Sequence, residues 1–274
     1  MDRRGFLRGA AIAAGGLGGG VGLSRLLPDL TAQVPQKVVA GAAYANEEWR
    51  DPGLRETRVI WRVDTPDRLV ALTFDDGPKP RNTAAVLAVL AEKKCPATFN
   101  VVGRNALEYP DLIKREIAGR HEIANHSWSH RDLAFAARDD ASYEIRRGHE
   151  VVHQLTGRES RFFRPPKGDV SGVALNAASR LGVDVLLWSL KLHESMFDAP
   201  GNVDYLAENV RPGDILLAHD VGNASRLVGL RALPGLIDRL RGLGYTFVTA
   251  SDLVASGRAV DTRAPTARPD EPVR

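Results

Sequence analysis

The chain has one cysteine, no long apolar run and no internal repeat. These absences limit the structures and functions that the chain can have. Cys95 is the only cysteine among 274 residues, so no disulfide can form within one chain. The weakly apolar run at residues 9–23 is about 15 residues long and rich in glycine, too short and too poor in helix formers to span a membrane. A Gly-x-Ser-x-Gly motif is also absent, which argues against the nucleophile elbow of a serine hydrolase.

The remaining composition is that of a globular protein. Hydrophobic residues make up 43% and charged residues 26% of the chain, which is enough apolar material for one sizeable core. The length fits one α/β domain of roughly 200 residues with a segment at each end. Residues 256–274 are rich in proline, alanine and mixed charge without an apolar period, and we predict that they form a disordered polar tail.

The N-terminal segment has the pattern of an export signal. Arg3 and Arg4 precede the weakly apolar run, an arrangement that resembles a twin-arginine signal. Small-x-small cleavage patterns occur at residues 40–42 and 43–45, and the sequence does not choose between them. Residues 1–45 contain five basic and two acidic residues, so their removal lowers the formal net charge from +3 to zero. The basic balance therefore belongs to the signal and does not indicate binding to nucleic acid.

Between these ends, strand-like and helix-like segments alternate. Seven short apolar segments are typical of strands: 69–74, 97–102, 122–124, 161–164, 183–190, 214–218 and 245–248. Six segments with helical spacing separate them: 83–93, 111–118, 141–155, 172–181, 203–209 and 233–243. This alternation predicts a parallel sheet, either open and doubly wound or closed as a barrel. Polar motifs follow at least four strands, which favours the barrel because it gathers the carboxyl ends of its strands around one mouth.

Two adjacent carboxylates end the first of these strands. The apolar segment 69–74 is followed by Asp75 and Asp76 and is then stopped by Gly77 and Pro78. Neighbouring side chains on an extended backbone point to opposite sides, so one aspartate can bind a cation while the other acts as a base. Asp-Gly-Pro is also ordinary turn chemistry, so the pair gains meaning only from the motifs that follow it.

Two histidines four residues apart follow the third strand. The neutral imidazoles of His126 and His130 can point at one metal ion, and an aspartate from another strand would complete a facial set with open positions. His149 and His153 have the same spacing within a predicted helix but no strand-end carboxylate nearby, and we interpret them as plain helix surface. His121 begins the third strand, where a buried structural hydrogen bond is the expected role.

Two further strand ends carry basic side chains. Arg164, followed by Pro165 and Pro166, puts a permanent charge on a stiff loop, where its guanidinium can hold a carboxylate bidentately. His219 follows the buried-type strand at 214–218 and is suited to donating a proton to a leaving group near neutral pH. Taken alone, the arginine is equally compatible with a surface position before a turn, and the histidine with a structural role in the core.

These motifs, in this order, resemble the polysaccharide deacetylase family, carbohydrate esterase family four, which includes chitooligosaccharide, peptidoglycan and acetylxylan deacetylases. The resemblance runs from about Arg58 to Val254 and implies a distorted (β/α)7-type barrel. We therefore predict an export signal and spacer at 1–45, a linker at 46–57 and a single catalytic domain at 58–255.

The resemblance also implies a role for each residue of the motifs. Asp75 becomes the general base, Arg164 its positioning partner and His219 the general acid. Three residues become ligands of a divalent metal, most readily Zn²⁺, with Co²⁺ or another divalent ion as the alternative: Asp76, His126 and His130. Four more become substrate-binding residues: Pro165, Lys167, Trp188 and Leu217. Of these, Leu217 would line the pocket for the acetyl methyl group.

The chain departs from the family pattern at two places. The family commonly has tyrosine where Lys167 stands, so a cation at the rim of the pocket is a difference that bears on substrate preference. The family also places an acidic residue shortly after Trp188, where it orients the catalytic histidine, and this acid is absent. Glu194, Asp198 or Asp220 are the candidates to replace it.

The expected function is a hydrolase that removes N-acetyl groups from amino sugars of an extracellular polysaccharide, of the peptidoglycan or chitin type. The enzyme would be delivered by the export machinery to the cell envelope or secreted, with no membrane span in the mature protein and no nucleic-acid partner. One alternative keeps the metal site but acts on O-acetyl esters of xylan or on non-sugar amides. Another is a non-catalytic carbohydrate-binding relic, which would predict loss of a metal ligand or of the base, whereas all four residues are present.

Overall fold

The computed structural model describes residues 55–193, 196–222 and 227–260. The predicted export segment at 1–45, most of the predicted linker at 46–57 and residues 261–274 of the predicted tail lie outside the described residues. Within the described part of the chain, no helix combines the length and the apolar character needed to cross a membrane.

The centre of the fold is a nine-stranded sheet in which every ladder is parallel. Its strand order is β1-β7-β6-β5-β4-β3-β9-β8, and β10 also pairs with β3. The strands are β1 (Val59–Ile60), β3 (Leu69–Asp75), β4 (Thr98–Val101), β5 (Glu122–Asn125), β6 (Phe162–Phe163), β7 (Asp184–Leu186), β8 (Leu190–Lys191), β9 (Ile215–His219) and β10 (Thr246–Val248). A separate antiparallel pair joins β2 (Arg62–Asp64) to β11 (Arg258–Val260).

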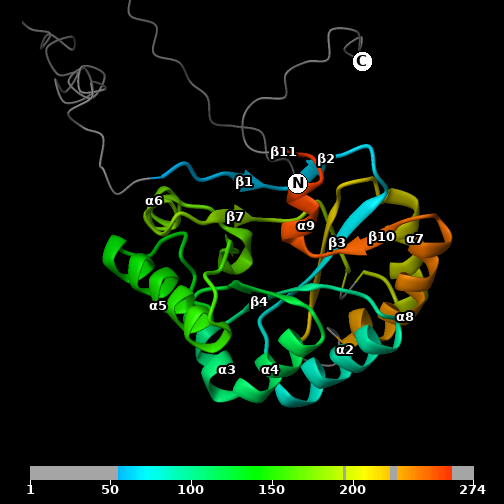
Figure 1. The fold of residues 1–274 in the computed structure, drawn as a ribbon, viewed down its shortest axis with the longest axis horizontal. Coiled ribbons are helices and arrows are strands. Elements are labelled where there is room, and N and C mark those ends of the chain that lie inside the picture. Colours follow the sequence, from blue (N-terminus) through cyan, green and yellow to red (C-terminus); the bar gives the residue numbers. More distant parts are fainter. Residues whose placement is uncertain (1–54, 194–195, 223–226, 261–274) are drawn as a thin grey trace, which may run out of the picture. The chain divides into compact units, whose positions relative to one another are not determined.

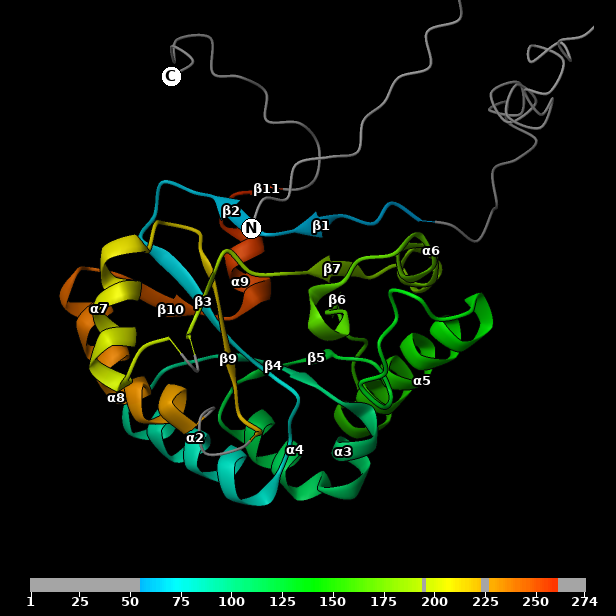
Figure 2. The same ribbon diagram turned by 180° about the vertical axis from the view of Figure 1, so that it is seen from behind.

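The helices connect successive strands, and α2, α3, α4, α5 and α8 lie along the outside of the sheet in both views (Figures 1 and 2). They are α2 (Pro80–Glu92), α3 (Gly103–Glu108), α4 (Pro110–Ala118), α5 (Arg138–Thr156), α6 (Gly172–Leu181), α7 (Ala199–Asn209), α8 (Leu227–Gly242), α9 (Ala250–Ala255) and the short 3₁₀ turn η3 (Pro166–Gly168). Local signals explain several ends. Pro80 and Pro110 occupy first turns, and Gly157 takes up a left-handed conformation directly after α5.

The sheet curves into a barrel because one segment of the chain, from β7 to β8, pairs with strands on two different sides of it. The chain from β7 to β8 is nearly continuous, and β7 pairs with β6 while β8 pairs with β9. Between them the backbone N–H of Ser189 donates to the carbonyl of Ile215 over 3.0 Å. This joins the two sides of the sheet, so the predicted distorted (β/α) barrel is confirmed and the open alternative is wrong.

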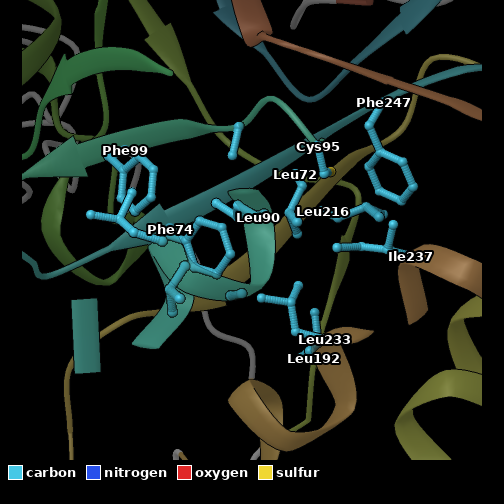
Figure 3. Close-up of a cluster of buried hydrophobic side chains, with 14 of the residues drawn as sticks. Leu72, Phe74, Leu90, Cys95, Phe99, Leu192, Leu216, Leu233, Ile237 and Phe247 are labelled. Carbon is cyan, nitrogen blue, oxygen red and sulfur yellow. The ribbon is translucent and has the colours of Figure 1, made fainter. Parts of the chain in front are cut away.

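The core lies on both faces of this sheet. Outside it, Phe74 of β3 and Phe99 of β4 stack with ring centroids 5.1 Å apart. Leucine and isoleucine side chains of β9 and α8 extend the same cluster, which also holds the buried Cys95 (Figure 3). Inside the barrel, Ala250 and Leu253 of α9 pack with Phe162 and close the end where the strands begin. Removing these side chains from water supplies the main stabilisation of the fold.

Several elements differ from the sequence prediction. The expected strand at 183–190 is interrupted, because residues 187–189 cross from one side of the barrel to the other. The predicted disordered tail is wrong for its first residues, since Arg258–Val260 form β11 and pair with β2. Helices α3 and α9, at six residues each, are too short to show a helical period.

Candidate active site

The two aspartates at the end of β3 lie in different environments. Asp75 is the last residue of the strand and is only 3% exposed. Asp76 follows with a left-handed φ of 77°, and its carbonyl accepts a hydrogen bond of 2.8 Å from Nδ2 of Asn105 in α3. A left-handed backbone at a non-glycine residue is strained and is held only by its surroundings. The chain therefore turns sharply after Asp75, and the two carboxylates separate.

Asp76, His126 and His130 form a compact cluster. One ligand atom from each lies within 4.8 Å of the other two, and the described residues contain no second such group of His, Cys, Asp or Glu side chains. Oδ1 of Asp76 is 2.9 Å from Nε2 of His130 and 3.4 Å from Nε2 of His126. Burial raises the pKa of Asp76, but hydrogen bonds and charge from the two histidines outweigh burial and hold it well below its usual range. The hydrogen bond to Asp76 raises the pKa of His130 against the opposing effect of burial.

This donor set fits a divalent metal. Two imidazole nitrogens and one carboxylate oxygen are ligands that Zn²⁺ prefers, and three protein ligands leave positions open for water and substrate. The ring nitrogen of His126 that faces away from the cluster also has a hydrogen-bond partner, because Nδ1 lies 2.7 Å from the backbone carbonyl of Arg164. A hydrogen bond donated by Nδ1 to this carbonyl leaves Nε2 unprotonated and able to bind a metal.

The turn that carries both histidines is built by side chains the sequence analysis missed. Asn125 accepts from the backbone N–H of Ser127 over 2.9 Å, and Ser127 in turn accepts from the N–H of His130 over 3.0 Å. Glu144 of α5 binds Ser129 through both its backbone N–H and its hydroxyl. The helix approaches closely because it has Gly148 at the contact, where a Cβ would lie 2.2 Å from Oδ1 of Asn125.

Arg164 is completely buried and holds Asp75. Its Nη1 donates to Oδ1 of Asp75 over 2.8 Å and to Oγ1 of Thr73 over 2.7 Å. Nε and Nη2 donate to the carbonyls of residues 186 and 187 over 2.8 and 2.9 Å. Nδ2 of Asn100 adds a further hydrogen bond of 2.7 Å to the same carboxylate oxygen of Asp75. Asp75 Oδ1 is thus fixed by two donors, while Oδ2 lies 3.9 Å from Nε2 of His126 and faces the metal cluster.

His219 ends β9, directly beside Asp75 in the parallel register of β3 and β9. Leu217, two residues earlier, points to the same side of the strand and is buried. The structure therefore brings the proposed base, acid and methyl-pocket residue to one edge of the sheet.

The candidates to replace the missing acid after Trp188 lie in different environments. Asp198 caps α7, where its Oδ1 accepts from the backbone N–H of Gly201 over 2.8 Å. Asp220 is buried and accepts from Oγ1 of Thr83 in α2 over 2.5 Å. Burial raises the pKa of Asp220 to about 7. Asp198 is thus engaged in capping α7, whereas Oδ1 of Asp220 is buried without a hydrogen-bond partner among the described residues, and Glu194 lies outside those residues.

The predicted substrate-binding residues lie around the loop after β6. Trp188 packs against the Arg164 guanidinium, 5.7 Å from its ring centroid, and against Gly168. Pro165 is buried, and its carbonyl accepts from the N–H of Gly168 over 2.9 Å. Lys167 is exposed and forms a 2.6 Å ion pair with Asp132. Its charge is therefore compensated by a neighbouring loop and is not a lone cation at the rim.

The remaining histidines have other roles. The prediction of a helix-surface position is wrong for His149, which is 8% exposed, and is confirmed for the exposed His153. Nε2 of His149 lies 2.5 Å from the Glu159 carboxylate, and Nδ1 of His153 lies 3.1 Å from it. Nδ1 of His121 accepts from the backbone N–H of Ala97 over 3.2 Å, which confirms a structural hydrogen bond.

Fold and site together define a hydrolase on a distorted barrel, and comparison with known proteins specifies the family. A model of the polysaccharide deacetylase family matches residues 62–186. The chain is 33% identical over 199 residues to a peptidoglycan-N-acetylglucosamine deacetylase of Bacillus cereus, covering 72% of this chain and 92% of the relative. It is 38% identical over 167 residues to a chitooligosaccharide deacetylase of Sinorhizobium fredii, covering 60% and 77%.

A solved structure of a peptidoglycan N-acetylglucosamine deacetylase matches the fold with a TM-score of 0.68 at 28% identity, covering 74% of this chain and 94% of the other. The chain belongs to the polysaccharide deacetylase family, as the resemblance of its motifs predicted. It is an enzyme of the class of carbohydrate esterase family four hydrolases.

Proposed function

We propose that this protein is a metal-dependent N-deacetylase that acts on acetylated amino sugars of an extracellular polysaccharide, of the peptidoglycan or chitin type. One observation carries the proposal: a buried carboxylate, Asp75, is fixed by Arg164 and Asn100 beside a cluster of two imidazoles and a second carboxylate. The named relatives that act on peptidoglycan and chitooligosaccharide support the choice of substrate class.

Asp76, His126 and His130 would hold the metal, with Zn²⁺ as the first choice on the chemistry of the ligands. A divalent ion bound there supplies Lewis acidity, which activates water near neutral pH and polarises an acetyl carbonyl. Two histidines and one carboxylate are also compatible with Co²⁺ and other divalent ions.

The protein's own residues carry the protons. Asp75 accepts a proton from water as the water attacks the acetamide carbonyl, and Arg164 keeps this carboxylate in place. A backbone N–H in the loop after Arg164 stabilises the developing oxyanion. His219 then donates a proton to the sugar nitrogen, so the carbon–nitrogen bond breaks and acetate and a free amine leave. Leu217 receives the acetyl methyl group against the wall of β9, and Trp188 with the loop that carries Pro165 and Lys167 forms the side of the pocket.

We also propose that the enzyme works outside the cytoplasm after twin-arginine export. The Arg3-Arg4 motif and the substrates of the named relatives support this location. Twin-arginine export suits a domain that folds and loads its metal before it leaves the cytoplasm.

Acetate release by the zinc-loaded full chain, measured in parallel on chitooligosaccharides, peptidoglycan and acetylxylan, tests the function. Release from an amino-sugar substrate, absent in Asp75→Asn and retained in the surface control Asp238→Asn, is the expected result. Release from acetylxylan alone would establish the esterase alternative. No release from any of the three, with zinc bound in a stoichiometric amount, would contradict the proposal and favour the binding relic.

A further inference from the structure

A pocket of about 550 Å³ lies at the opposite end of the barrel from the active site. The catalytic side chains stand where β3 and β9 end, whereas this pocket is formed where β5 and β6 begin and where α9 covers the sheet. Ser251 of α9 donates its backbone N–H to Glu122, the first residue of β5, which ties the floor of the pocket to the sheet. The charged and imidazole side chains that line the pocket are Arg120, His121, Glu122, Arg158, Glu159 and Arg161.

Three arginines and two glutamates line this pocket. Arg120 comes from the turn between α4 and β5, and Arg158 and Arg161 come from the loop between α5 and β6. All three are exposed, and none forms an ion pair within the described part of the chain, in contrast to Arg146, which is 2.5 Å from Glu150. The guanidinium of Arg161 lies 5.9 Å from the ring centroid of Phe162, at the end of the barrel where β6 begins.

The two acids of the pocket are already occupied by other partners. Oε2 of Glu122 accepts from Thr98 and from the backbone of Ser251, each over 3.0 Å, and its Oε1 accepts from the Ser251 hydroxyl. The carboxylate of Glu159 pairs with the imidazoles of His149 and His153 in α5. The free hydrogen-bonding capacity that remains in the pocket is therefore mainly that of guanidinium donors, which favours an anionic ligand.

His121 lies in the same wall and carries no charge near neutral pH. Its Nδ1 accepts from the backbone N–H of Ala97, so the ring proton is on Nε2. Burial lowers the pKa of His121 to about 4, so the ring stays neutral near pH 7 and adds no charge to the pocket.

We propose that this pocket binds a phosphate group carried by a small polyol or sugar. Arginine forks match the oxygen geometry of phosphate, and three of them around one pocket suit a doubly charged group better than a single carboxylate. The volume exceeds that of phosphate alone, which leaves room for the organic part. This inference stands apart from the proposed deacetylation, because no residue of the pocket belongs to the metal cluster or contacts Asp75.

Isothermal titration calorimetry of the full chain with glycerol 1-phosphate, and with glycerol as the uncharged comparison, tests the proposal. Saturable binding of the phosphate and none of glycerol is expected. The double variant Arg158→Gln/Arg161→Gln should weaken binding at least tenfold, since charge-assisted hydrogen bonds are lost. Its acetate release should stay at the wild-type rate, because the pocket lies at the other end of the barrel.

Two controls separate this site from charge in general and from the metal. Arg81→Gln removes one exposed positive charge on α2, away from the pocket, and should leave the affinity within twofold. His130→Ala disrupts the metal cluster and should still bind the phosphate. Absence of saturable binding, equal weakening in Arg81→Gln, or loss of binding in His130→Ala would each overturn the proposal.

Discussion

Replacing Arg164 with lysine probes the part of the site on which the proposed mechanism most depends. The guanidinium makes four buried hydrogen bonds that spread over three nitrogens: to Thr73, Asp75, and the carbonyls of residues 186 and 187. Lysine keeps the charge but places its donors at one point. It can reach Asp75 and Thr73 together, because one nitrogen of the arginine serves both, and it then leaves the two carbonyls without a donor.

The cost follows from those two carbonyls. A buried acceptor without a partner costs about 1–3 kcal/mol, so Arg164→Lys should lower the free energy of unfolding by roughly 2–6 kcal/mol. A domain of this kind has a total stability of about 5–15 kcal/mol, so the loss is a large fraction of it. Activity should fall further than stability alone requires, because an ammonium group without the hydrogen bonds to the two carbonyls holds Asp75 less rigidly.

Urea denaturation followed by circular dichroism measures this loss, with Arg161→Lys as the matched control. The exposed Arg161 guanidinium has no ion pair among the described residues, and its replacement should change stability by less than about 0.5 kcal/mol. A loss below about 1 kcal/mol for Arg164→Lys would refute the reasoning, since it would mean that the buried carbonyls do not depend on the fork.

Three further predictions concern separate parts of the molecule. Asp75→Asn should abolish acetate release while zinc remains bound in a direct metal assay; loss of zinc would show that the two aspartates have the opposite roles. Gly148→Ala should weaken zinc binding at least tenfold in a competition titration, because a Cβ there comes within 2.2 Å of a side-chain oxygen of the metal-ligand turn, whereas Gly172→Ala, with open space at its Cβ, should not. Folding lowers the pKa of His121 from 6.5 to about 4, so the unfolded chain takes up a proton first and stability falls as the pH drops through this window. His121→Asn keeps the acceptor without the titration, and after allowance for solvent screening its loss of stability between pH 7 and pH 5 should be smaller by about 1 kcal/mol; equal losses in chemical denaturation would contradict this assignment.

The regular elements could be predicted from the sequence because their signals are local. The buried run ending at Asp75 and the alternation of strands and helices both follow from nearest-neighbour patterns. The short elements were missed for a physical reason. Strands β1 and β2, with two and three residues, exist only because β7 and β11 supply their hydrogen bonds. Pairing of that kind depends on residues more than 100 positions away and leaves no period in the sequence.

The residues that hold the site in place were harder to predict than the residues of the site. Asp75, Arg164 and the histidines stand in recognisable motifs, but Asn100, Asn105 and Glu144 do not. Asn100 pairs with Asp75 only because β3 and β4 lie in a particular register, and Glu144 reaches Ser129 only because α5 packs closely through a glycine. Each of these contacts is a consequence of tertiary packing. An amide side chain inside the largely apolar segment 97–102 is the one signal that would have pointed to Asn100.

The placement of the two adjacent aspartates at one site, in different positions, rests on the backbone rather than on the side chains themselves. Alternation along a strand alone would place Asp75 and Asp76 on opposite faces of the sheet, so it accounts for their different roles but not for a shared site. The left-handed φ of Asp76 ends the alternation, and the hydrogen bond from Asn105 to its carbonyl holds that turn. Gly77 is the next residue, and there is no room for a side chain there because a Cβ would lie 2.3 Å from the carboxylate of Asp220. Asp75 therefore stays in the sheet beside Arg164 while Asp76 lies beside the histidines, which is the arrangement that the proposed mechanism needs for one carboxylate to accept a proton and the other to bind the metal.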